Sequence, residues 1–308
     1  MDRVSMRVAA EPVSVPAARQ FVTDGLSAWG ELDVVDDVRL CVSELAANAA
    51  LHAGGDFMDV SLERLPDAVR VQVSDEGQTP LDDLRAQALL NGRAGAVPDR
   101  TVTTGRGLFL VEALAKAWGV VATDRGTLIW ADVSSAESLG SPRPRIRPEL
   151  PPGGEHPHMP AEWRVLRLLD CPVELSLRQD EHLDELIREL QLVDADDAPP
   201  SMVAVMTGLL ATQAHARHTG RRAALQAQAA GLDHLTVEMP ALVSVADDVE
   251  ALHHVVREAD RLCHERELLT LAADPEISLL RDWMTETIVD QVRHGAEPVS
   301  WEVWRTTH

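Results

Sequence analysis

The sequence predicts an α+β fold: a two-layer sandwich of helices and a largely antiparallel sheet, followed by a mainly α-helical domain. Two strand pairs and three helical segments are expected in residues 1–133, whereas helical spacing dominates residues 161–308. Between them, residues 134–160 contain seven prolines and three glycines. We expect this segment to be a linker without helix or strand. At 308 residues the chain is long enough for two domains with cores of their own.

The first third of residues 1–133 reads as a short strand and two helices. The strand is expected near 7–12, and the amphipathic helix 14–30 should end at Gly30. A second helix should open at Asp33, a residue type that caps helix N-termini well. Apolar residues recur on one side of this second helix, so we expect that side to face the sheet.

The remainder of the first domain reads as two hairpins around a third helix. Residues 57–77 alternate apolar and polar positions on either side of a turn, which predicts a strand pair. Residues 107–120 predict a helix, and 120–133 predict a second hairpin with its turn at Asp124–Gly126. Residues 81–104 show no strong pattern. A loop of this length inside a compact domain is usually functional or mobile.

The second domain is expected to be built mainly from helices. Helical spacing covers 176–190, 199–218, 242–263 and 275–292, with short strand-like pieces at 171–177 and 234–240. We expect the tryptophans of this half to anchor packing at the edges of the domain; they are Trp163, Trp283, Trp301 and Trp304. His254 and His264 are ten residues apart on one expected helix, about 15 Å in rise, which is too far to share a metal ion.

Composition excludes some classes of function. A net charge of −22 argues against a nucleic-acid-binding surface, which needs clustered lysine and arginine. No apolar run reaches the length of a bilayer span, and the N-terminus lacks the apolar core of a signal peptide. Three widely spaced cysteines fit a reducing compartment. We therefore expect a cytoplasmic protein with no direct nucleic-acid or membrane partner.

Three short stretches of the first domain carry polar residues and glycines at regular spacing. Glu44, Asn48 and His52 are four residues apart and share one helix face. Asp75 ends a predicted strand two residues before Gly77. A third stretch has the sequence Gly-Arg-Gly-Leu directly before a helix. Each alone is more often structural: a solvated helix face, a turn, or a tight helix entry.

Together, in this order, the three stretches resemble the motifs of the histidine-kinase-like ATPase superfamily, the GHKL or Bergerat fold, and most closely its anti-sigma-factor serine kinases. "ELAANAALHA" is similar to the N box, "DEGQTP" to the G1 box and "GRGL" to the G2 box. The resemblance covers residues 1–133. The matching positions are Glu44, Leu45, Asn48, Ala49, His52, Ala53, Asp75, Gly77, Pro80, Gly105, Arg106, Gly107 and Leu108.

The resemblance implies an ATP site with Mg²⁺. It implies that Asp75 accepts from the adenine amino group, beside Gly77, with Thr127 as a second contact near the base. The amide oxygen of Asn48 suits Mg²⁺, which prefers a few oxygen ligands besides phosphate and water. Glu44, one helical turn earlier, would orient or deprotonate the attacking hydroxyl or water.

The G2 box is expected to bind phosphate. Gly105, Arg106, Gly107 and Leu108 would present backbone N–H groups and the positive end of a helix dipole. The resemblance identifies residues 81–104 as the lid over ATP. His52 is read as a structural helix-end residue, and Cys41 as part of the core.

Two functions remain open from the sequence. One is an anti-sigma-type serine/threonine protein kinase that binds a sigma factor and phosphorylates an antagonist protein. The other is a nucleotide-dependent regulator that binds a partner without phosphotransfer. A sensor histidine kinase core is disfavoured, because no histidine precedes Glu44. A gyrase- or chaperone-type ATPase is disfavoured because a proline-rich linker and a helical domain follow the site, where such enzymes carry a transducer domain.

The resemblance also implies homodimerisation. Residues 165–190 distantly resemble a helical domain that accompanies such ATPases in actinobacterial regulators. For the second domain we expect a role in sensing or protein contact.

Overall fold

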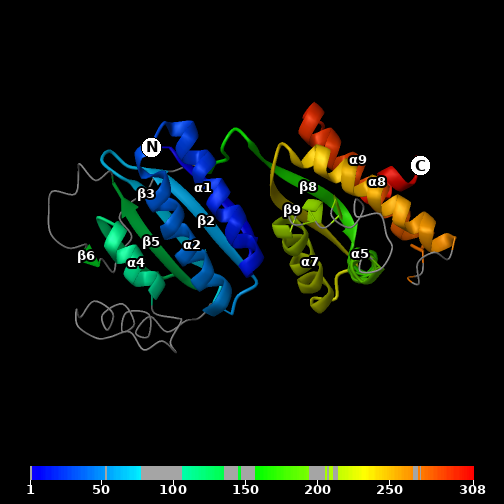
Figure 1. The fold of residues 1–308 in the computed structure, drawn as a ribbon, viewed down its shortest axis with the longest axis horizontal. Coiled ribbons are helices and arrows are strands. Elements are labelled where there is room, and N and C mark those ends of the chain that lie inside the picture. The colour runs from blue at the N-terminus through cyan, green and yellow to red at the C-terminus, as the bar shows by residue number, and fades with distance from the viewer. Residues whose placement is uncertain are drawn as a thin grey trace. The chain divides into compact units, whose positions relative to one another are not determined.

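The computed structural model describes residues 2–52, 54–77, 106–134, 145–146, 157–193, 205–206, 208–210, 214–265, 270 and 272–308. The chain divides into two compact units, residues 1–163 and 164–308. The first unit is an α+β sandwich, and helices predominate in the second, as predicted (Figure 1). Each unit is described by itself.

A seven-stranded sheet forms one layer of the first unit, in the order β6-β4-β5-β3-β2-β1-β7. Neighbouring strands among β1 to β5 pair antiparallel, whereas the short edge strands β6 and β7 pair parallel to β4 and β1. The strands are β1 (Arg3–Ala9), β2 (Phe57–Arg64), β3 (Val69–Asp75), β4 (Ala117–Ala122), β5 (Thr127–Val133), β6 (Arg145–Ile146) and β7 (Pro157–His158).

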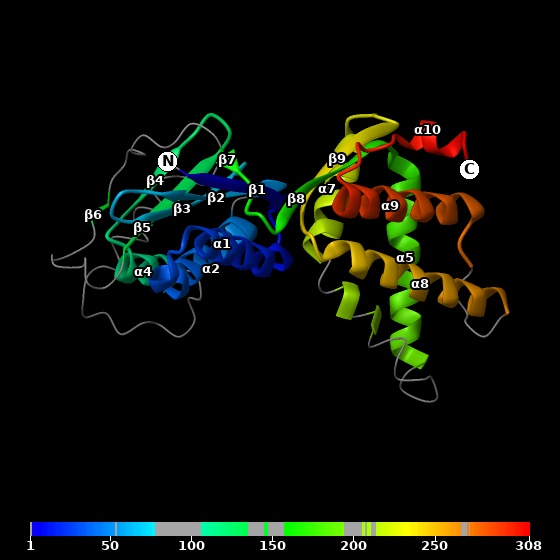
Figure 2. The ribbon, with the colours of Figure 1, turned by 90° about the horizontal axis from the view of Figure 1, so that it is seen from above.

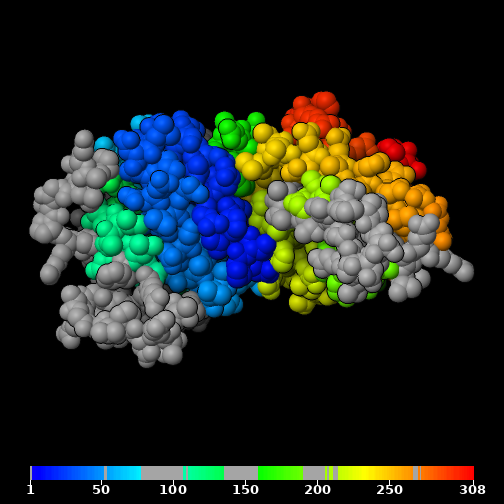
Figure 3. Space-filling model, viewed as in Figure 1, coloured from blue at the N-terminus to red at the C-terminus, as the bar shows by residue number. Residues whose placement is uncertain are grey.

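Helices form the second layer and cover one face of this sheet (Figure 2). They are α1 (Val15–Trp29), α2 (Val35–His52) and α4 (Arg106–Leu114). In Figure 3 the blue atoms of α1 and α2 lie side by side on the visible face of this unit. Phe21 of α1 and Leu45 of α2 are fully buried beneath them, so apolar burial against the sheet holds the layers together.

The observed helix ends agree only in part with the ends predicted from the sequence. Gly30 ends α1 in the left-handed conformation, with φ 74°, as predicted. Asp33 was predicted to cap the second helix, but it lies within a short 3₁₀ turn, Leu32–Val34, and α2 begins at Val35. Because Asp33 already lies in this helical turn, it does not take the N-cap position before α2, and the capping prediction was wrong.

The third helix is shorter than predicted. It ends at Leu114, and residues 117–120, expected to be helical, belong to strand β4. Trp118 in that strand is almost fully buried, which favours placing it in the sheet. A run of apolar residues that is buried on both sides has no period that distinguishes helix from strand.

The proline-rich segment 134–160 also departs from expectation, because β6 and β7 lie within it. Both are two-residue edge strands, the position where proline is tolerated in a sheet. Just beyond β7, Trp163 packs edge-on against Phe21 at 5.6 Å and donates from its indole N–H to Asp24 at 2.7 Å. The first unit therefore includes part of the expected linker.

The second unit combines a two-stranded sheet with helices. Strands β8 (Trp163–Pro172) and β9 (His234–Leu242) pair, and each is followed by a long helix. Strand β9 was predicted; β8 was not, since a strand was expected at 171–177, where α5 begins. Helix α7 also continues past the expected end at residue 218. The helices are α5 (Val173–Val193), α7 (Ala214–Ala229), α8 (Val245–His264), α9 (Pro275–His294) and α10 (Trp301–Arg305).

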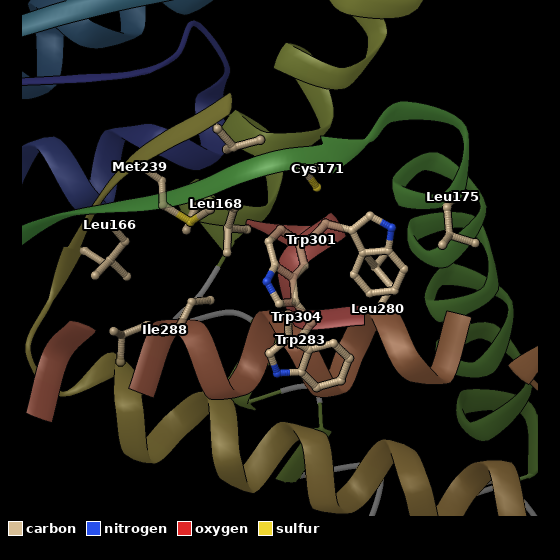
Figure 4. Packing of buried hydrophobic residues seen from close by; sticks show 14 of the residues in the cluster. Leu166, Leu168, Cys171, Leu175, Met239, Leu280, Trp283, Ile288, Trp301 and Trp304 are labelled. Atoms are coloured by element: carbon tan, nitrogen blue, oxygen red, sulfur yellow. The ribbon is translucent and has the colours of Figure 1, made fainter. Parts of the chain in front are cut away.

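Three tryptophans lie in the core of this unit, whereas the sequence predicts them at the edges of the domain. The ring centroids of Trp283, in α9, and Trp301 are 5.6 Å apart. Trp301 stacks on Trp304 with 6.1 Å between the ring centroids. Figure 4 shows these rings beside Leu168 and Leu280, between the strands and α9. The indole N–H of Trp283 donates to the carbonyl of Val299, and that of Trp304 donates to Glu286, so these two rings are buried with their polar atoms satisfied.

Candidate functional site

Strand pairing brings two of the predicted adenine-contacting residues together. Asp75, the last residue of β3, stands opposite Thr127, the first residue of β5. Both are buried, with 7% and 2% of their surfaces exposed. The backbone N–H of Gly77 donates to the Asp75 carboxylate at 2.8 Å. Asp75, Gly77 and Thr127 therefore form one polar cluster at the end of the sheet.

Burial and hydrogen bonding act in opposite directions on the Asp75 carboxyl. Burial raises its pKa, while the backbone N–H groups of Gly77 and Thr127 lower it. Burial is the larger effect. These donors fix the orientation of the carboxyl, which leaves a defined acceptor in a partly dehydrated position.

Gly126, one residue before Thr127, allows the β4–β5 turn to approach this cluster. A Cβ at Gly126 would overlap the Asp75 carbonyl oxygen and lie 2.9 Å from the carbonyl carbon of Glu76. The obstacle is backbone, which does not move away cheaply. The sequence marks Gly126 as a turn residue; the close approach requires the strand register, which spacing alone does not give.

The loop after α2 reaches the same end of β3. Gly54 has φ 71°, in the left-handed region. A Cβ at the next residue, Gly55, would lie 2.9 Å from the Cβ of Glu76. Glu76 is itself paired with Arg7, which also bonds Asp59 at 3.2 Å. The C-terminal end of α2 is thus held close to the turn that follows Asp75.

A second cluster forms where α2 packs against α4. The side chains of Glu44 and Asn48 lie one turn apart on α2, both half-buried. A Cβ added to Gly107 would overlap Oε2 of Glu44 and lie 3.4 Å from its Cβ. Leu108, the next residue, is 4% exposed and anchors the start of α4. The predicted N and G2 boxes are therefore in direct contact through Glu44 and Gly107.

Within the part of the chain that the structure describes, neither the Glu44 carboxylate nor the Asn48 amide makes a hydrogen bond. Cys41, one turn before Glu44, is fully buried, and burial raises the pKa of its thiol to about 12, so it is no nucleophile at neutral pH. This agrees with the expectation that Cys41 is core.

Some predicted site residues lie outside the described residues. These are Gly105, the side chain of Arg106, the side chain of His52 and the predicted lid, 81–104. The backbone of Arg106 begins α4, and that of His52 ends α2.

The donor and acceptor set fits a magnesium nucleotide. Asp75 supplies an oriented carboxylate acceptor for an amino group, and Asn48 an amide oxygen of the kind that Mg²⁺ accepts. Gly107 leaves α4 without a Cβ where the helix meets Glu44, and the positive end of a helix favours phosphate. Among the described residues, no group of three or more histidine, cysteine or acidic residues suits a metal ion by itself. Phosphate oxygens would have to complete the Mg²⁺ ligands.

Among the described residues, no helix is both long enough and apolar enough to cross a bilayer.

Comparison with known proteins gives a consistent result. Residues 8–132 match the model of the histidine kinase-like ATPase domain. The serine-protein kinase RsbW of Listeria monocytogenes serotype 4a is 29% identical over 118 residues, 37% of this chain and 75% of the relative. RsbW of Bacillus velezensis is 29% identical over 119 residues, 37% of this chain and 74% of its own. These matches bear out the family inferred from the three motifs.

Proposed function

Since residues 8–132 match the model of the histidine kinase-like ATPase domain, we propose that the chain is an ATP-dependent serine/threonine protein kinase of the anti-sigma type. It binds a sigma factor and phosphorylates an antagonist protein, and phosphorylation of the antagonist controls which partner is held. The names of the relatives, serine-protein kinase RsbW, support the kinase assignment.

One observation carries the proposal: the Glu44 carboxylate lies against Gly107 at the start of α4. A base for an attacking hydroxyl must lie beside the phosphate-binding element. A protein that only bound nucleotide would need the adenine cluster and the helix N-terminus, but no carboxylate at the position of Glu44. The position of Glu44 therefore favours phosphotransfer over binding alone.

The proposed roles follow from what each residue offers. Asp75 accepts from the adenine amino group, and the N–H groups of Gly77 and Thr127 keep its carboxylate oriented. Asn48 supplies an oxygen to Mg²⁺, and the backbone N–H groups at the start of α4 bind phosphate. Glu44 takes the proton from the acceptor hydroxyl. ATP would supply its γ-phosphoryl group and leave as ADP, and bound Mg²⁺ would neutralise the charge of the phosphates.

The test separates transfer from binding. The purified chain is incubated with Mg²⁺, γ-phosphate-labelled ATP and the proteins that it retains from the native cytoplasm. We expect label on a serine or threonine of a retained protein. Glu44→Gln should lower transfer by about 10²–10⁴-fold, since it removes a general base, and should leave ATP binding unchanged.

Asp36→Asn is the matched control, because it neutralises another carboxylate on the same helix. The Asp36 side chain is 93% exposed and its ion pair with Arg39 is long, at 3.7 Å, so its removal should change little. If wild type binds ATP but labels no retained protein, the chain is a nucleotide-dependent binding regulator. If Glu44→Gln transfers at the wild-type rate, Glu44 is not the base.

A further inference from the structure

A cavity of about 190 Å³, partly open to solvent, lies in the second unit. It is bordered by both strands and by α5, α7, α8 and α9, and its walls are mostly apolar, with Leu168, Met239 and Ile288 among them (Figure 4). All its lining residues belong to residues 164–308. A cavity of about 150 Å³ with aliphatic and aromatic walls stays dry and binds benzene, so this one is large enough for a small ring compound.

One face of α7 keeps this space open. Ala216, Gly220 and Ala224 line the cavity at intervals of four residues, and therefore share one side of the helix. A Cβ added to Gly220 would meet only a methyl group of Val237, at the ordinary contact distance of 3.9 Å. Backbone crowding does not require glycine at this position.

The charged residues around the cavity neutralise one another. Arg217 contacts Asp184 at 2.6 Å, and Arg221 contacts Asp180 at 2.9 Å, which joins α7 to α5 through matched charges. A charged ligand would have to compete with these pairs. An uncharged ligand would not, so the electrostatics favour an uncharged molecule.

Arg281, which borders the cavity from α9, has one donor to spare. It is 7% exposed, and it bonds Asp260 and His182 Nδ1 through its two terminal nitrogens, each at 2.9 Å. Its Nε is buried and has no hydrogen-bond partner among the described residues. A buried donor without an acceptor is costly, and because almost none of the surface of this nitrogen is accessible, a ligand oxygen reaches it only after a small rotation of the Arg281 side chain.

We propose that the second unit binds a small, uncharged, mostly apolar molecule that carries one hydrogen-bond acceptor, such as a carbonyl oxygen, in this cavity. The apolar walls enclose the body of the molecule, and Arg281 Nε donates to its acceptor. The assignment does not depend on the nucleotide site of the first unit.

Two probes of nearly equal shape test both parts of the proposal. Acetophenone has a ring and one carbonyl; ethylbenzene has the same outline without the acceptor. Isothermal titration of the full chain at matched concentrations, limited by the solubility of the hydrocarbon, should show binding of both, with acetophenone about tenfold tighter. No binding of acetophenone, or equal affinities for the two probes, would overturn the proposal.

Variants at Gly220 locate the binding. Gly220→Leu should fill part of the cavity and weaken acetophenone binding by about tenfold or more, whereas Gly220→Ala should change it by less than about threefold. Unchanged binding to a folded Gly220→Leu would place the probe outside the cavity and refute the assignment. Gly220→Ala controls for the change in helix propensity.

A conservative change at Arg281 tests the acceptor contact. Arg281→Lys keeps a positive charge beside Asp260 but lacks the Nε–H group. We expect the preference for acetophenone to disappear while ethylbenzene still binds, and binding of ethylbenzene shows that the variant is folded around its cavity. A preference that survives in this variant would contradict the role given to Arg281.

Discussion

Gly107→Ala is the most direct test of the contact between α2 and α4. The added methyl group would overlap Oε2 of Glu44, while the Cβ of Glu44, 3.4 Å away, would be tight but tolerable. The obstacle is the end of a flexible side chain, so Glu44 can rotate away. The substitution should therefore displace the proposed base without disrupting the helix packing.

The magnitudes decide what the experiment would show. Forcing Glu44 into a less favourable rotamer costs about 0.5–1.5 kcal/mol. Replacing glycine by alanine within a helix returns up to about 1 kcal/mol. The two nearly cancel, so the free energy of unfolding should change by less than about 1 kcal/mol, or roughly 2–4 °C in Tm. Loss of a positioned base should lower phosphotransfer by about 10²–10⁴-fold.

Gly30→Ala should have the opposite effect to Gly107→Ala: it should lower stability and leave phosphotransfer unchanged. Gly30 has φ 74° and nothing within 4 Å of an added Cβ, so the variant pays backbone strain of about 1–2 kcal/mol without a steric clash. It should unfold more readily and still transfer phosphate at the wild-type rate. Thermal melts, ATP-binding titrations and transfer assays on both variants complete the comparison. A Gly107→Ala protein with normal transfer would refute the reasoning.

Three further outcomes are expected. Gly126→Ala should weaken ATP binding and destabilise the first unit by more than about 1 kcal/mol, because its Cβ would meet backbone atoms at 2.9 Å; equal stability and affinity would contradict this. Asp132→Ala should cost about 1.5–3 kcal/mol in urea denaturation, since it removes two hydrogen bonds to the buried Arg70 guanidinium, at 2.6 and 3.0 Å; Asp132→Asn should cost less. Burial lowers the pKa of His215 and His253, so the unfolded chain takes up protons first as pH falls below about 6.5, and the stability of the second unit should drop there. The measurement is the urea midpoint of unfolding between about pH 7.5 and about pH 5. A midpoint that does not change over this range would contradict the predicted loss of stability.

The sequence predicts the layers of the first unit well, because their pattern is local. Alternation in 57–77 and a glycine at the end of α1 each determine a feature without knowledge of the rest of the chain. The errors lie where tertiary contacts decide. Trp118 belongs to a strand because the sheet buries it, and β6 and β7 form because sheet edges lie next to the proline-rich segment.

The candidate site is predictable in its parts and less so in its assembly. Spacing alone places Glu44 and Asn48 on one face of a helix, and places Asp75 at the end of a strand. Three contacts require the register and the packing of distant segments: Asp75 opposite Thr127, Gly126 against the end of β3, and Gly107 against Glu44. Sequence motifs identify which residues to look for, but the distances between them come from the fold.

The cavity in the second unit illustrates what neither pattern nor composition reveals. Unfilled apolar space forfeits the van der Waals contacts that close packing would supply, and about 190 Å³ of it is large for a protein interior. Gly220 adds a further cost of about 1 kcal/mol as a helix-interior glycine, although a larger side chain would fit there. Both costs fall if the space is occupied, because a bound molecule restores the missing contacts and stabilises the folded state by mass action. A glycine that keeps a cavity open at the expense of stability is therefore better explained by a ligand than by packing.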